Sequence, residues 1–148
     1  MPFRHPDRSA DLVARIEYEV RERLEEAVDY VCLEALVRER RAHGLPPPAA
    51  ENADDRRTYT DHVLTFLRRL RRELTPALSP DEQRKAAGAA DAPGDEQARL
   101  IAVQVALART LPDYWQRFEA VSSSYLAGPD AASGREGRGL LGRLFGRR

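Results

Sequence analysis

The feature that most constrains the fold is a long helical pattern that fills the first third of the chain. Between residues 9 and 43, apolar side chains recur at steps of three and four, which is typical of one face of a helix. They are Val13, Ile16, Val20, Leu24, Ala27, Val28, Val31 and Ala35. Ser9 is expected to cap this helix, and Gly44 with the following "LPPP" to end it. At about 1.5 Å per residue, roughly 34 residues span about 50 Å, and that length favours a bundle or an oligomer interface.

Two further helices are predicted before residue 90. The first covers residues 52–74 and opens among Asn and Asp side chains that can cap it. Its buried stripe is expected to be Val63, Phe66, Leu67, Leu70 and Leu74. The second is short, with Ser79 as its cap and Pro80 at its first position, where proline is well tolerated.

The last two helices are separated by Pro112, which breaks the helical pattern. Residues 95–111 carry apolar side chains and alanines around almost the whole cylinder, so this helix is predicted to be the most buried. Residues 113–127 place large side chains on one side of a final helix. They are Tyr114, Trp115, Phe118, Val121, Tyr125 and Leu126.

No stretch alternates with the period of a strand, so the predicted fold class is all-α. We expect a helical bundle of four main helices plus one short helix, with a disordered C-terminal tail. Residues 1–8 are expected to be a flexible N-terminus, and residues 9–128 the bundle domain. Residues 129–139 form a polar, Gly-rich tether, and residues 140–148 a basic amphipathic tail.

Charge and cysteine usage narrow the class of protein. The 148 residues carry a formal net charge of zero, so no global field attracts nucleic acid or anionic lipid. Cys32 is the single cysteine, which excludes an internal disulfide, and we expect it at the margin of the core. Because neither a secretory signal nor a membrane-spanning run is recognisable, the expected location is cytoplasmic, peripheral at most to the inner membrane or a protein assembly.

The C-terminal tail is the strongest indication of a partner. Residues 129–148 carry five arginines against two acidic residues. In a helix, one side would carry Leu140, Leu141, Leu144 and Phe145, and the other Arg143, Arg147 and Arg148. Gly139, Gly142 and Gly146 each disfavour a helix by about 1 kcal/mol, so the tail is expected to fold only on an anionic membrane or an apolar protein groove. In layout it resembles the tethered docking peptides of cargo proteins in bacterial encapsulin shells.

Two Arg–His pairs are candidates for catalysis. They lie in "RERRAH", from Arg38 to His43, and in "RTYTDH", from Arg57 to His62. Histidine can transfer a proton near neutral pH, while arginine can stabilise phosphate charge. The spacing resembles that of helical ribonucleases of the HEPN type, and this resemblance implies RNA cleavage by these four residues. The alternative is that they are ordinary surface residues near helix ends.

An arginine cluster is a candidate phosphate-binding surface. Its members, from "LRRLRRE", are Arg68, Arg69, Arg71 and Arg72. Such a face can lie along nucleic-acid phosphates, each contact adding salt-dependent affinity. No aromatic residue interleaves the arginines to stack on bases, so a solvated or ion-paired face is the favoured interpretation.

No metal or cofactor is predicted. A carboxylate-bridged metal in a bundle needs a Glu-x-x-His pair, and the sequence has none. Glu17 falls within the apolar stripe of the first helix, where we expect a salt bridge across a helix or subunit seam. Nucleophile and phosphate-loop motifs are also missing.

The predicted function is therefore a non-catalytic helical adaptor, recruited to a membrane surface or protein scaffold through its tail. A homodimer through the long first helix is expected. The alternative is a nucleic-acid-binding protein or HEPN-like ribonuclease that uses the Arg–His pairs.

Overall fold

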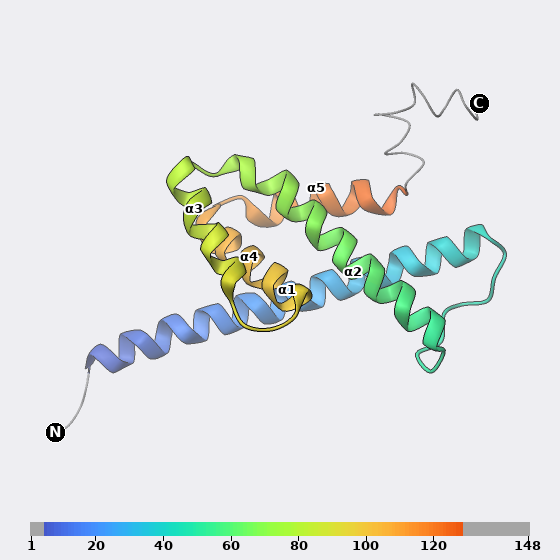
Figure 1. Ribbon diagram of the computed structural model, residues 1–148, viewed down its shortest axis with the longest axis horizontal. Helices are drawn as coiled ribbons and strands as arrows, with labels where there is room; N and C mark the ends of the chain where they lie inside the picture. The colour runs from blue at the N-terminus through green and yellow to red at the C-terminus, as the bar shows by residue number, and fades with distance from the viewer. Residues whose placement is uncertain (1–4, 129–148) are drawn as a thin grey trace.

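The computed structural model describes residues 5–128, with side chains from Ala10 onward, and this part of the chain is all-α (Figure 1). The helices are α1 (His5–Ala42), α2 (Ala53–Leu74), α3 (Pro80–Gly88), α4 (Glu96–Thr110) and α5 (Tyr114–Leu126). Short 3₁₀ turns, Thr75–Ala77 and Ala89–Asp91, flank α3. The prediction of four main helices and one short helix is confirmed.

Side-chain caps set three of the helix starts. The Asn52 side chain accepts hydrogen bonds from two backbone amides in the first turn of α2. At α3, Ser79 and Glu82 form a reciprocal capping box, with proline at the first helical position. Asp95 accepts from a backbone amide of α4 at 2.9 Å. The sequence predicted the first two starts from these same cap residues.

The start of α1 differs from the prediction. The helix begins at His5, so Ser9 lies inside it and does not cap it. Pro6 explains the earlier start, because proline in the first turn has the backbone angle of a helix and no amide that needs an acceptor. At the other end, Gly44 adopts a φ of 67°, the left-handed conformation that glycine adopts without strain.

Helix α4 lies at the centre of the bundle. Each of the other four α-helices packs against it, as Figure 1 shows for its position in the middle of the molecule. Its buried apolar side chains are Leu100, Ile101, Val103, Val105 and Leu107. Its central position and its buried side chains agree with the prediction that this helix is the most buried.

A buried ion pair fixes the connection between α1 and α2. Arg40 donates to Asp55 at 2.7 Å and to the backbone oxygen of Pro46. The second carboxylate oxygen of Asp55 accepts from the Ala49 amide at 2.9 Å. The carboxylate therefore holds the loop, and the C-terminal end of α1, against the start of α2.

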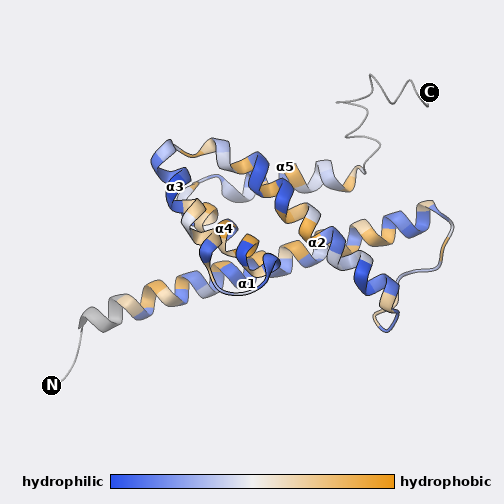
Figure 2. Cartoon of the chain, in the orientation of Figure 1, coloured by the Kyte–Doolittle hydropathy of each residue, from blue (hydrophilic) through white to orange (hydrophobic). Residues whose placement is uncertain are grey.

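The N-terminal part of α1 extends beyond the other helices (Figure 1). Every described side chain from 10 to 19, which we call the projecting segment, is exposed. Leu12 is 57%, Val13 44% and Ile16 41% exposed, and Figure 2 shows hydrophobic colouring on this part of the α1 ribbon. The bundle therefore leaves Val13 and Ile16 of the predicted apolar stripe uncovered, because the shorter helices do not reach them.

One ion pair ties the projecting segment to the bundle. Glu17 of α1 bonds to Arg109 in the last turn of α4. The predicted salt bridge of Glu17 across a helix seam is confirmed. Both side chains remain substantially exposed, so the pair lies at the surface and not within an apolar stripe.

Candidate functional site

His62 forms the centre of a polar junction between three helices. Its Nε2 lies 2.8 Å from the Glu39 carboxylate on α1, and its Nδ1 lies 2.6 Å from the Tyr125 hydroxyl on α5. The Tyr125 ring meets the His62 ring edge to face, with centroids 5.8 Å apart. Both imidazole nitrogens are therefore engaged by side chains from other helices.

The chemistry of the three groups defines their hydrogen-bond directions. An ionised carboxylate can only accept, so Nε2 of His62 donates to Glu39. In the neutral imidazole, Nδ1 is then the acceptor and the Tyr125 hydroxyl donates to it. Burial raises the pKa of Tyr125, which keeps the phenol protonated at neutral pH. The junction is a satisfied network that joins α1, α2 and α5.

In each of the two candidate Arg–His pairs, the arginine and the histidine contact different groups. Arg38 bonds to Glu34 at 2.9 Å and to the backbone oxygen of Leu126. His43 lies at the exposed end of α1, with Nδ1 2.8 Å from the backbone oxygen of its own helix. Arg57 forms an ion pair with Asp54 at 2.8 Å. Because Arg57 and His62 are five residues apart, they point about 140° away from each other around α2.

Carboxylates occupy much of the arginine cluster. Arg68 forms two 2.7 Å bonds to Glu96 at the start of α4. Arg69 bonds to Glu73 at 2.7 Å and is only 17% exposed. Arg72 lies 3.8 Å from the same Glu73 carboxylate. Three of the four arginines are therefore ion-paired, as the favoured interpretation of the cluster predicted.

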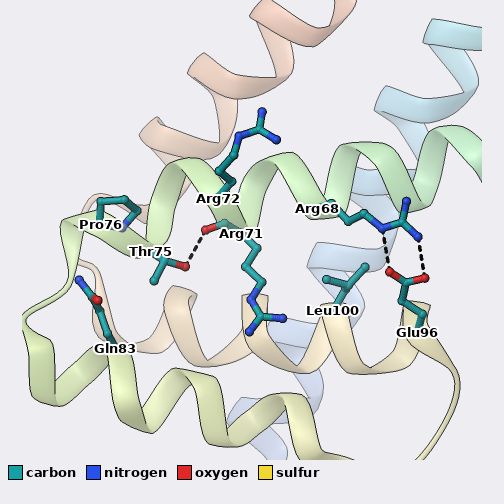
Figure 3. A pocket seen from close by; sticks show the side chains of 8 residues that line it. All are labelled: Arg68, Arg71, Arg72, Thr75, Pro76, Gln83, Glu96 and Leu100. Atoms are coloured by element: carbon teal, nitrogen blue, oxygen red, sulfur yellow. Dashed lines mark hydrogen bonds and ion pairs between the residues drawn. The ribbon is translucent and has the colours of Figure 1, made fainter.

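The Arg68–Glu96 pair also perturbs the ionisation of both groups. The hydrogen bond from Arg68 lowers the pKa of Glu96, and the same bond raises the pKa of Arg68. Both groups are exposed, so salt screens their attraction. The pair forms one end of an open cleft between α2, α3 and α4 (Figure 3).

That cleft has a volume of about 640 Å³. Its lining is Arg68, Arg71, Arg72, Thr75, Pro76, Gln83, Glu96 and Leu100. Sequence reasoning identified the arginines but missed Gln83, Glu96 and Leu100. No local motif could have revealed them, since α3 and α4 meet α2 only through tertiary packing. The same holds for Glu39 and Tyr125 at the His62 junction.

Cys32 lies deeper than predicted. It is fully buried within the core, whereas the sequence indicated the core margin. Burial, with a smaller contribution from Asp29, raises the pKa of its thiol to about 12. It belongs to the hydrophobic core cluster, and its electrostatic influence on Tyr59 of α2 and Tyr125 of α5 places it near both helices.

The predictions on metal binding, membrane spans and the tail concern residues that the structure describes only in part. Within residues 5–128, no group of three or more His, Cys, Asp or Glu side chains is arranged to hold a metal ion. None of the helices in this part combines the length and apolar character needed to cross a membrane. The predicted tail contacts lie outside the described residues. They are Leu140, Leu141, Arg143, Leu144, Phe145, Arg147 and Arg148.

Comparison with known proteins adds no relative. No family model matches the chain, and no curated protein or solved structure matches it significantly.

Proposed function

We propose that this chain is a non-catalytic helical interaction module, which dimerises through the projecting segment of α1 and is recruited to an anionic membrane by its C-terminal tail. The observation that carries the proposal is the exposed apolar face of residues 10–19. A single helix end in water gains no stability from burial, and short isolated helices are marginal. A partner helix would provide that burial.

The spacing of the exposed face supports a second copy as the partner. Val13, Ile16, Val20 and Ala27 follow steps of three, four and seven, the pattern of two helices that pair along a seam. Val20 and Ala27 are half-buried against the core, so the seam continues into the bundle. In a twofold dimer the same stripe faces itself, and its apolar side chains are complementary.

The size of the exposed face predicts a weak dimer. A specific interface buries roughly 800 Å² on each partner. Three side chains about half exposed supply only part of that area. The fraction of dimer is therefore expected to change with protein concentration over the range that sedimentation experiments use.

Dimerisation would strengthen a weak tail. Burying the four large apolar side chains of residues 140–148 yields roughly 6–10 kcal/mol, while ordering about ten residues opposes it by ~1 kcal/mol or more each. Each arginine adds about 1 kcal/mol on an anionic surface. One tail thus binds weakly, but two tails on one dimer bind with avidity.

Sedimentation equilibrium of the full chain tests the dimer. Ile16→Glu places a charge in the seam and should convert a concentration-dependent dimer into a monomer. The matched control is Tyr18→Gln, since Tyr18 is also exposed on the projecting segment but bonds to Glu22, away from the seam. A wild-type monomer at all concentrations, or equal effects of both variants, would overturn the dimer.

Co-sedimentation with vesicles tests the tail. The full chain should pellet with vesicles containing anionic lipid and remain in solution with neutral ones. Leu144→Ser with Phe145→Ser should abolish pelleting. Equal pelleting of this variant and the wild type would exclude membrane recruitment by the tail, and no pelleting of either would favour a protein scaffold instead.

The alternative function, nucleic-acid binding or HEPN-like cleavage, has less support. Arg57 and His62 diverge, and the carboxylates of Glu73 and Glu96 already engage the arginine cluster. RNA cleavage by the wild type that disappears in His43→Ala with His62→Ala would establish the alternative.

A further inference from the structure

The cleft between α2, α3 and α4 contains a cation without a counter-ion. Arg71 is half-buried in its wall and forms no ion pair with any described residue. Its neighbours Arg68, Arg69 and Arg72 each lie within 4.0 Å of a carboxylate. A guanidinium is always charged, and partial removal from water without a partner is unfavourable.

The direction of the side chains concentrates this charge inside the cleft. Figure 3 shows Arg71 reaching from α2 toward α4, while Arg72 points the opposite way. Arg68 lies at the far end, where its bidentate bond to Glu96 fixes it. As far as residues 5–128 are concerned, Arg71 is therefore a cationic group in the hollow that no carboxylate pairs with.

The charge inside the cleft suits an anionic ligand. Arg72 points out of the cleft and Arg68 is paired with Glu96, so among the described residues the Arg71 guanidinium is the uncompensated positive charge that a ligand meets. A phosphate monoester carries close to two negative charges at neutral pH, and a guanidinium can bond two of its oxygens at once. A carboxylate of similar size has only one charge.

The remaining lining suits an organic group. Pro76 contributes an exposed apolar edge, and Leu100 of α4, which is only 5% exposed, closes the floor. Gln83 is held in place on α3 by a 3.0 Å bond to the backbone oxygen of Leu78. The volume of about 640 Å³ falls within the range of small-molecule sites.

We propose that this cleft binds a small phosphate monoester, whose phosphoryl oxygens pair with Arg71 and whose organic part packs against Pro76. A polynucleotide is a poorer match, because a backbone needs a row of free cations and Arg69 is largely buried against Glu73. The site shares no residue with the dimer seam or the tail, so it does not depend on the proposed function.

Calorimetric titration of the full chain with phenyl phosphate tests the site. Arg71→Gln should weaken binding by about tenfold or more, because it removes a charge-assisted, bidentate contact. Arg72→Gln is the matched control, with the same charge change on the adjacent residue, and should have little effect. Arg71→Lys should fall between wild type and Arg71→Gln, since it keeps the charge but loses the fork.

Four comparisons can overturn the proposal. Equal weakening by Arg71→Gln and Arg72→Gln would mean that only net charge matters. Benzoate binding as tightly as phenyl phosphate would remove the preference for a dianion, and equal affinity for inorganic phosphate would remove the organic part. Tighter binding of a short RNA, reduced equally by both glutamine variants, would assign the cluster to nucleic acid. Thermal melting of each variant confirms that it is folded.

Discussion

The two ends of α1 show how one helical pattern can meet two environments. Near the middle of the helix, Leu24 is fully buried and Val28 is 3% exposed. Eleven residues before Leu24, Val13 of the same apolar stripe is 44% exposed, although it belongs to the same continuous helix. Periodicity in the sequence defines which side of a helix is apolar. Whether that side is covered depends on how far the neighbouring helices extend.

The difference has an energetic consequence. Full burial of a large apolar side chain stabilises a fold by roughly 1.5–3 kcal/mol, and only the embedded part of α1 gains this. The projecting segment depends on helix propagation from the bundle and on the Glu17–Arg109 pair. The embedded part and the projecting segment should therefore differ measurably in stability, and a partner on the projecting segment would reduce that difference.

The largest expected contrast is in cysteine reactivity. With its pKa raised to about 12 by burial, Cys32 has a thiolate fraction at neutral pH that is lower than that of an exposed cysteine by about a thousandfold or more. Ala14→Cys places a matched thiol on the projecting segment. Alkylation of both, followed by peptide mass spectrometry, should show rapid modification at 14 and slow modification at 32. Similar rates would mean that the embedded part opens readily.

The next contrast compares two identical truncations. Leu24→Ala should lower the free energy of unfolding by about 2–5 kcal/mol, because it leaves a cavity in the core. Leu12→Ala should change it by less than about 0.5 kcal/mol, since the side chain lies at the surface. Urea denaturation at low protein concentration measures both. A large effect of Leu12→Ala would show that something in this chain already covers the projecting segment.

The comparison of the two parts of α1 also shows which features could be predicted from the sequence. Helix order, the caps at Asn52 and Ser79, and the central position of α4 follow from local rules of propensity and periodicity. The exposure of Val13 and Ile16 does not, because it depends on the relative lengths of packed helices. Nor could sequence place Glu39 and Tyr125 around His62, since those contacts join residues 23 and 63 positions apart.

The embedded end of α1 should respond to loss of its anchor. Asp55→Asn weakens the buried pair with Arg40, and we expect a loss of about 2 kcal/mol in the free energy of unfolding. Asp54→Asn is the control, because it removes the same charge from the same first turn but breaks only an exposed pair with Arg57. Its effect should stay below about 1 kcal/mol. Equal effects would mean that the helix dipole, and not the buried contact, accounts for both.

The smallest effect is expected at the boundary between the two parts of α1. Glu17→Gln removes the exposed pair with Arg109 and should change the free energy of unfolding by about 0.2–1 kcal/mol, with faster amide hydrogen exchange confined to residues 10–19. Glu19→Gln is the control, because Glu19 is exposed and forms no ion pair with a described residue. In a monomer the exchange rates are independent of protein concentration. If exchange in the projecting segment slows as the protein is concentrated, and Ile16→Glu removes that slowing, then a second copy and not α4 provides the missing cover.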